Sequence, residues 1–323
     1  MQAPLAGGAS TVALAAAVCD AGGLGFLAAG MKTPDKLLQQ VRDLRGATTA
    51  SFGVNVFVPA RAPGDPGQVQ RYVDQLRAAG AEPGEPRFED DGWEAKLALL
   101  EEQHPAVVSF TFGCPPAGVV TALQGAGSEV WVTVTSPAEA CEAGATGADA
   151  LIAQGVEAGG HRGGFDDQSG GELGLLALLA LLGGPESGLP LVASGGIATA
   201  PTVAAVLAAG ARAAQVGTAF MRCPEAGTHP MHREALAKPA PTALTRAFTG
   251  RRARGIANRF MAEHEDAPAA YPELLHVMGP LRAAAARSGD REGLNLWAGQ
   301  AHELARAAPA AEVVAMLAER GAY

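Results

Sequence analysis

A histidine in a glycine-rich loop is the first residue of this chain whose type and position suit it for chemistry. An apolar run ends at Gln154, and His161 follows it with five glycines between positions 155 and 164. Such a loop is flexible unless a ligand orders it, so its histidine is no ordinary core residue. An imidazole titrates near neutral pH and can take or give a proton. His161 is therefore the candidate catalytic base, and a hydrogen bond that merely stabilises the loop is the alternative.

Two later loops have the composition of phosphate-binding turns. One follows the apolar run that ends at Ser194, and the other follows the run that begins at Ala213. Glycine lets backbone N–H groups approach a phosphate closely, and Thr218 adds a hydroxyl donor. The candidate binding residues are Gly195, Gly196, Gln215, Val216, Gly217 and Thr218. Ordinary turns between strands and helices are the alternative reading of both loops.

Eight short apolar runs, separated by helical patterns, indicate the elements that position these loops. The predicted strands are residues 3–5, 24–27, 52–56, 106–112, 129–134, 148–154, 189–194 and 213–220. Continuous β-branched runs such as 130–134 are typical of parallel strands that are buried on both faces. We therefore expect an α/β protein with a TIM (β/α)₈ barrel over residues 1–222, and a doubly wound sheet is the alternative. In a barrel the polar strand ends, Asn55 and Gln154 included, meet at one rim.

Residues 223–323 have a different pattern, which predicts a smaller helical region. They are richer in arginine and histidine and show no buried strand pattern, so we expect them to pack on or over the barrel mouth. Four arginines between positions 250 and 260 are interpreted as a solvated turn or an internal ion-pair network, with a phosphate contact as the alternative. His229 and His232 have no third ligand at a suitable spacing, so no metal site is predicted.

Composition disfavours several classes of partner. The formal net charge is −9 and there is no long basic run, which argues against nucleic acid and anionic membranes. The alanine-rich residues 12–18 lack a basic flank and are bracketed by glycines, so neither a signal peptide nor a membrane span is predicted. Four cysteines without a CxxC pair fit a reducing compartment, so we expect a cytoplasmic location. The expected partners are small molecules, and a homo-oligomer stays open.

The predicted phosphate belongs to a substrate or to a cofactor, and FMN fits the pattern well. No GxGxxG motif with an acidic residue at the expected distance follows the first strand, and no P-loop is present. With the phosphate at the two late loops, the amide side chains of Asn55 and Gln154 would face the flavin ring as donors and acceptors. The sequence therefore predicts a flavin site at the barrel rim.

Six segments, in order along the chain, resemble the nitronate monooxygenase family of FMN-dependent barrels, formerly called 2-nitropropane dioxygenases. They are residues 4–10, 53–57, 154–161, 193–197, 215–218 and 296–300, and the block at 157–161 is the most specific. The resemblance implies FMN contacts from Asn55, Gln154, Gly159, Gly196 and residues 215–218, with His161 as the catalytic base. It implies that dioxygen oxidises an alkyl nitronate, through FMN, to a carbonyl compound and nitrite. His161 would also let neutral nitroalkanes react, by removing the α-proton.

Two other functions share these features. The same motifs mark FMN-dependent enoyl-acyl-carrier-protein reductases, which take hydride from NADH, and related barrels reduce quinones. An NAD(P)H-dependent reductase is therefore the alternative, and segment 296–300 favours the monooxygenase. A non-catalytic flavin- or phosphate-binding barrel is a third hypothesis, and His161 in its glycine loop argues against it.

Overall fold

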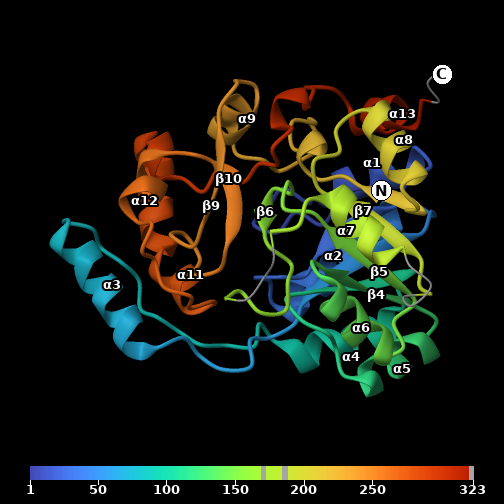
Figure 1. Ribbon diagram of the computed structural model, residues 1–323, viewed down its shortest axis with the longest axis horizontal. Helices are drawn as coiled ribbons and strands as arrows, with labels where there is room; N and C mark the ends of the chain where they lie inside the picture. Colours follow the sequence, from blue (N-terminus) through green and yellow to red (C-terminus); the bar gives the residue numbers. More distant parts are fainter. Residues whose placement is uncertain (169–171, 184–187, 320–323) are drawn as a thin grey trace.

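A curved sheet of seven parallel strands forms the larger part of the molecule (Figure 1). The computed structural model describes residues 1–168, 172–183 and 188–319. In their order across the sheet, the strands are β1 (Gly25–Ala28), β2 (Phe52–Phe57), β3 (Val107–Thr111), β4 (Glu129–Val134), β5 (Ala150–Gln154), β7 (Leu191–Ser194) and β8 (Ala213–Gln215). Every residue of β1 and β2 is buried, as expected for parallel strands packed on both faces. The predicted α/β barrel is confirmed.

The first three residues join the two edges of this sheet and close the barrel. Gln2 forms a parallel bridge with Val216, which follows β8, and its N–H donates to the carbonyl of Leu24, which precedes β1, at 2.9 Å. The Ala3 N–H donates to the Val216 carbonyl at 2.8 Å. The prediction that the first strand spans residues 3–5 is wrong, because the pairing ends at Ala3. Pro4 has no N–H to donate, so the ladder cannot continue through it.

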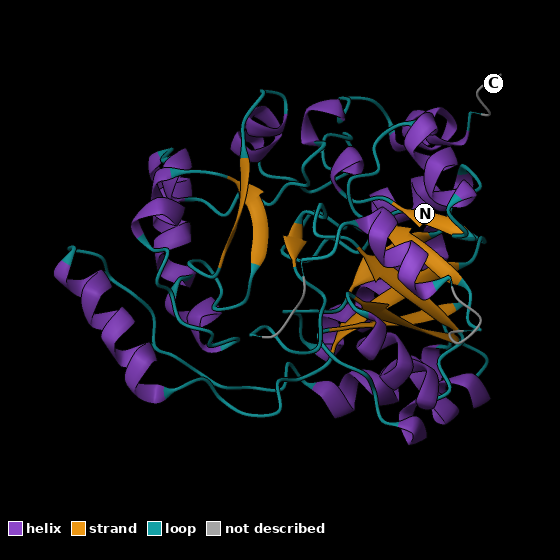
Figure 2. Ribbon diagram, viewed as in Figure 1, coloured by secondary structure: helices purple, strands orange, loops and turns teal. Residues whose placement is uncertain are grey.

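Helices cover the outer face of the barrel (Figure 2). They are α1 (Val12–Asp20), α2 (Pro34–Ala47), α4 (Trp93–Gln103), α5 (Ala117–Gly125), α6 (Pro137–Ala145), α7 (Leu175–Leu182), α8 (Ala200–Ala208) and α13 (Ala310–Ala318). The starts of α2, α6 and α8 are set locally, because Thr33, Ser136 and Thr199 accept a backbone N–H three residues on and proline follows within the first turn. No helix among the described residues has the length and apolar content needed to cross a membrane.

A second region lies over one end of the barrel. Its elements are α3 (Pro66–Ala78), α9 (Pro230–Leu236), β9 (Thr242–Thr245), β10 (Ala253–Ile256), α10 (Arg259–Glu263), α11 (Glu273–Val277) and α12 (Gly279–Ser288). The prediction that this part lacks strands is wrong. Strand β10 pairs antiparallel with both β9 and β6 (Gly160–His161), and this small sheet lies between the barrel and the helices α11 and α12 in Figure 1. Strand β10 is fully buried but contains Arg254 and Gly255, so it does not form the apolar run by which the other strands were predicted.

The two regions exchange segments across the predicted boundary at residue 222. Helix α3 comes early in the chain but packs in the second region, where Tyr72 joins a buried cluster with Phe248 and Leu274. The Tyr72 hydroxyl donates to the Ala247 carbonyl at 3.2 Å. Conversely, α13 at the end of the chain packs against α1 and α8 on the barrel. The packing of α3 in the second region and of α13 on the barrel therefore connects the two regions.

Candidate active site

A cavity of about 850 Å³ lies where the carboxyl ends of the strands meet the second region. The barrel contributes a row of polar side chains to its wall: Asn55, Thr111, Thr133, Gln154, Ser194 and Gln215. In the sheet Gln154 pairs with Ser194, and Ser194 pairs with Gln215, so these strands end at one level. The opposite wall comes from Leu275, Arg282, Asn295 and Trp297. The volume is within the usual range for sites that bind a cofactor or small molecule.

Every site residue predicted from the sequence lines this cavity. They are Asn55, Gln154, Gly159, His161, Gly195, Gly196, Gln215, Val216, Gly217 and Thr218. The common position follows from the barrel, because parallel strands present their carboxyl ends, and the loops after them, at one rim. Their roles in binding and catalysis stay predictions.

The two glycine loops after β7 and β8 offer unpaired backbone donors to the cavity. Gly195 and Gly196 have φ angles of +113° and +69°, which side chains rarely adopt, and a Cβ on Gly195 would lie 3.0 Å from the Ala158 nitrogen. The N–H groups of Gly195, Gly196 and Gly217 have no acceptor within the described chain. The Gln215 side-chain nitrogen is buried without a partner there as well. The half-buried glycine N–H groups and the buried Gln215 nitrogen lack acceptors among the described residues, so this wall suits an anionic ligand with many oxygens.

The two predicted amide side chains are not equivalent. The Asn55 Nδ2 is held by β3, with the Ser109 and Thr111 hydroxyl oxygens each 3.0 Å away. This contact leaves the Asn55 Oδ1 as the atom available to a ligand. The Gln154 amide instead holds the histidine loop, because its Nε2 donates to the His161 carbonyl at 3.1 Å and its Oε1 accepts the Gly163 N–H at 2.8 Å. Gln154 therefore orders the loop as well as lining the cavity.

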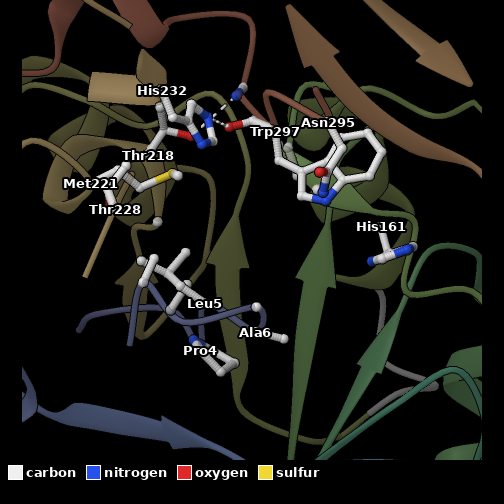
Figure 3. A pocket seen from close by; sticks show the side chains of 18 of the residues that line it. Pro4, Leu5, Ala6, His161, Thr218, Met221, Thr228, His232, Asn295 and Trp297 are labelled. Carbon is white, nitrogen blue, oxygen red and sulfur yellow. Dashed lines mark hydrogen bonds between the residues drawn. The ribbon is translucent and has the colours of Figure 1, made fainter. Parts of the chain in front are cut away.

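Strand pairing and three aromatic rings position His161. The residue belongs to β6 and pairs with Ala253 of β10 in the second region. Its ring lies 5.6 Å from the rings of Phe112 and Trp297 and 5.9 Å from the ring of Tyr271, measured between centroids. Figure 3 shows Trp297 beside His161, with Leu5 and Thr218 farther along the cavity. The loop is thus ordered by protein contacts as well as by any ligand.

A threonine decides which ring nitrogen of His161 carries the hydrogen. The His161 Nε2 lies 2.9 Å from the Thr249 Oγ1, and this hydroxyl lies 3.2 Å from the Arg251 carbonyl. A carbonyl only accepts, so the hydroxyl donates its hydrogen to Arg251 and accepts one from Nε2. The neutral ring then carries its hydrogen on Nε2, which leaves the lone pair of Nδ1 free to accept a proton.

Burial and two arginines keep His161 neutral. Loss of hydration lowers the pKa of His161 from 6.5 to about 3, and the positive charges of Arg251 and Arg282 act in the same direction. At neutral pH the imidazole is therefore uncharged and can act as a proton acceptor. The formation of an imidazolium in this site needs a new negative charge nearby, which a substrate that loses a proton would supply.

None of the four arginines predicted at 250–260 lines the cavity. Arg251 lies over the Phe112 ring, 4.1 Å from its centroid, and donates to the Arg162 carbonyl. Arg252 lies 3.8 Å from Asp167 in an ion pair, so the internal-network interpretation is right for this residue. The phosphate alternative for this cluster has no support, because none of the four arginines reaches the cavity.

Four residues of this site were not predictable from the sequence: Thr249, Tyr271, Arg282 and Asn295. They belong to turns and helices after residue 222, where no strand pattern marks a rim. Trp297 lies within the segment 296–300 that carries the family resemblance, but its contact with His161 had no signal in the sequence. No regular interval along the sequence relates these residues to His161, so only the tertiary structure brings them together.

The family model for nitronate monooxygenase matches residues 1–320. The chain belongs to the nitronate monooxygenase family. It is 43% identical to the nitronate monooxygenase of Pseudomonas aeruginosa over 99% of this chain and 95% of that protein. The family consists of oxidoreductases, so the protein is an enzyme, and the resemblance described from the sequence is confirmed.

Solved structures agree with this membership. The nitroalkane oxidase from Streptomyces ansochromogenes is 51% identical and superimposes with a TM-score of 0.93, over 98% of this chain and 94% of that chain. FabK from Thermotoga maritima is 27% identical with a TM-score of 0.75, over 98% and 90% of the two chains. The nitroalkane oxidase and FabK therefore share the barrel and the second region of this chain.

Proposed function

We propose that this protein oxidises alkyl nitronates with dioxygen, using bound FMN, and yields a carbonyl compound and nitrite. We propose that it also accepts neutral nitroalkanes, whose α-proton His161 removes. The observation that carries the proposal is a neutral histidine in the same cavity as two loops of unpaired backbone donors. The names of the relatives, nitronate monooxygenase and nitroalkane oxidase, support the substrate class.

The residues of the cavity fit FMN. The free N–H groups of Gly195, Gly196 and Gly217, with the Thr218 hydroxyl, would hold the phosphate. The unpartnered Gln215 nitrogen and the free Asn55 oxygen are a donor and an acceptor for the polar edge of the ring. When bound, FMN supplies an acceptor for the electrons of the nitronate and passes them to dioxygen.

His161 performs the proton transfer that a neutral nitroalkane needs. Its Nδ1 accepts the α-proton, while Thr249 and the pairing with β10 hold the ring in place. The resulting imidazolium and the nitronate carry opposite charges in a site of low polarity, so each stabilises the other. A nitronate arrives without this proton, so its oxidation does not require the base.

The aromatic residues around His161 keep water away from this step. Phe112, Tyr271 and Trp297 surround the ring, and Phe112 is itself buried. Exclusion of water strengthens the electrostatic interaction between the base and the new carbanion. The same wall gives the substrate an apolar surface for its alkyl chain.

One anaerobic experiment tests the proposal against its alternatives. The purified protein is expected to carry or take up FMN, and an alkyl nitronate is expected to bleach the visible flavin absorbance. Bleaching by NADH and not by the nitronate would favour the reductase, an alternative that the likeness to FabK supports. Bleaching by neither would favour a non-catalytic flavin-binding barrel. His161→Ala is expected to lose about 10²- to 10⁴-fold in turnover of neutral nitroalkane and to retain FMN.

We also infer that the protein works in the cytoplasm on small molecules. The four cysteines are free, as they remain in a reducing compartment. The negative charge argues against nucleic acid and anionic membrane surfaces as partners. A homo-oligomer is compatible with these features, and sedimentation of the purified protein tests it.

A further inference from the structure

Arg282 is a half-buried cation on the cavity wall, and no acid among the described residues forms an ion pair with it. It lies in α12, where its Nε donates to the Met278 carbonyl at 3.3 Å and its Nη2 donates to the Leu275 carbonyl at 3.1 Å. Within the described part of the chain, no carboxylate forms an ion pair with it, and Nη1 has no acceptor. Arg282 lines the cavity, and Nη1 is the guanidinium nitrogen that has no protein acceptor among the described residues.

Three buried arginines of this region differ from Arg282, because carboxylates lie near each of them. Burial lowers the pKa of Arg162, Arg251 and Arg254, but nearby carboxylates oppose the decrease in each case. Burial also lowers the pKa of Arg282, and no carboxylate opposes it. A partly desolvated charge without a counter-charge attracts an anion, so an anion that enters the cavity would be stabilised at this position.

Arg282 lies in the part of the cavity where the chemistry is proposed to occur. Both Arg282 and His161 line this cavity. The phosphate donors lie on the barrel side, in the loops after β7 and β8, whereas Arg282 comes from α12 on the opposite wall. The phosphate loops therefore leave the Arg282 charge without a partner and available to the substrate.

We propose that Arg282 recognises the substrate as an anion, by binding two oxygens that share one negative charge. These oxygens belong to the nitronate group itself or to a carboxylate elsewhere on the substrate. The planar guanidinium is suited to this pairing, because its N–H groups match two oxygens in one plane. This proposal rests on the proposed function for the identity of the substrate, and it makes Arg282 the residue that favours nitronates over neutral nitroalkanes.

Binding of an unreactive anion tests the proposal without any turnover. Butanoate and butanamide have the same carbon chain and differ in charge, and calorimetry of the flavin-loaded protein measures the affinity for each. We expect Arg282→Met to weaken butanoate binding about 10- to 150-fold, as expected for the loss of a hydrogen bond to a charged group. Butanamide binding is expected to change less than about 2-fold, since a neutral amide gains little from the cation.

Two further variants separate recognition from folding. Arg287→Met removes the same charge from an exposed position of α12 and is expected to leave butanoate binding unchanged. Arg282→Lys keeps the charge and is expected to retain most of the affinity even if the contacts to Leu275 and Met278 weaken. Equal butanoate affinity in Arg282→Met and the wild type, or equal losses for butanoate and butanamide, would overturn the proposal. If Arg282→Met does not fold, butanoate binding is compared between Arg282→Gln, which lacks the charge, and Arg282→Lys, which keeps it.

Steady-state kinetics then identify the anion. We expect Arg282→Met to raise KM for a simple alkyl nitronate about 10-fold or more, with little change for the neutral nitroalkane of the same skeleton. An increase confined to a nitronate that also bears a carboxylate would assign Arg282 to the carboxylate. No increase for either anion would overturn the role of Arg282 in substrate recognition. If the wild type binds butanoate through Arg282 but oxidises no nitronate, the proposed function fails and the anion site stands.

Discussion

Replacement of Thr249 by valine is expected to impair proton removal and to spare nitronate oxidation. Valine keeps the shape of the side chain and removes the hydroxyl that lies 2.9 Å from the His161 Nε2 and 3.2 Å from the Arg251 carbonyl. Thr249 is almost fully buried, so water cannot replace the lost group. The ring then loses the contact that holds its hydrogen on Nε2, and Nδ1 is no longer kept free for the substrate.

The size of the effect follows from the lost hydrogen bond. A buried donor that is left without an acceptor costs about 1–3 kcal/mol, which corresponds to a decrease of about 5- to 150-fold in the productive form of the histidine. The ratio of kcat/KM for a neutral nitroalkane to that for its own nitronate is expected to fall by this factor. Oxygen consumption measures both rates in the same buffer, and His161→Ala gives the limit expected when the base is absent.

The matched control is Thr249→Ser, which keeps the hydroxyl and is expected to keep the ratio near the wild-type value. FMN content and the thermal midpoint of unfolding show whether either variant disturbs the fold. An unchanged ratio in Thr249→Val would refute the assignment of the ring hydrogen to Nε2. Equal losses for nitroalkane and nitronate would show that Thr249 supports the fold rather than the orientation of the base.

Two further outcomes are expected. Gly195→Ala introduces a Cβ 3.0 Å from the Ala158 nitrogen at a φ of +113°, and the resulting strain is about 1–3 kcal/mol. We therefore expect FMN to dissociate more readily from this variant, and quenching of flavin fluorescence measures the dissociation. Gly210→Ala, at a φ of +101° with open space around it, is the control and should lower only the thermal midpoint. The second outcome concerns pH. The unfolded chain protonates His161 near 6.5 and the folded chain only near 3, so the free energy of unfolding falls as pH drops between these values. From pH 6.5 to 5, urea denaturation should show the wild type losing up to about 2 kcal/mol more than His161→Gln. Parallel losses in both proteins would contradict the low pKa of this histidine.

The barrel and the list of rim residues follow from the sequence because both depend on local patterns. A parallel strand buried on both faces needs a short apolar run, and its carboxyl end must then lie at the common rim. Asn55, His161 and Gly195 were therefore predictable as neighbours in space, although 106 residues separate the first two and 34 residues separate the last two along the chain. The glycine loops were predictable for the same reason, since close approach to a ligand requires that residue type.

The chemistry of the histidine was decided only by the tertiary structure. Its hydrogen-bond partner Thr249 is 88 residues away, and the two arginines that lower its pKa come from other elements of the second region. Strand β10, which pairs with the histidine loop, and its other neighbour β9 show no apolar run, because polar residues and glycine interrupt them. The residue types in the sequence show that an imidazole lies at the rim of the barrel. Desolvation and charge from distant segments determine that it is neutral, and the contact with Thr249 determines which nitrogen is free.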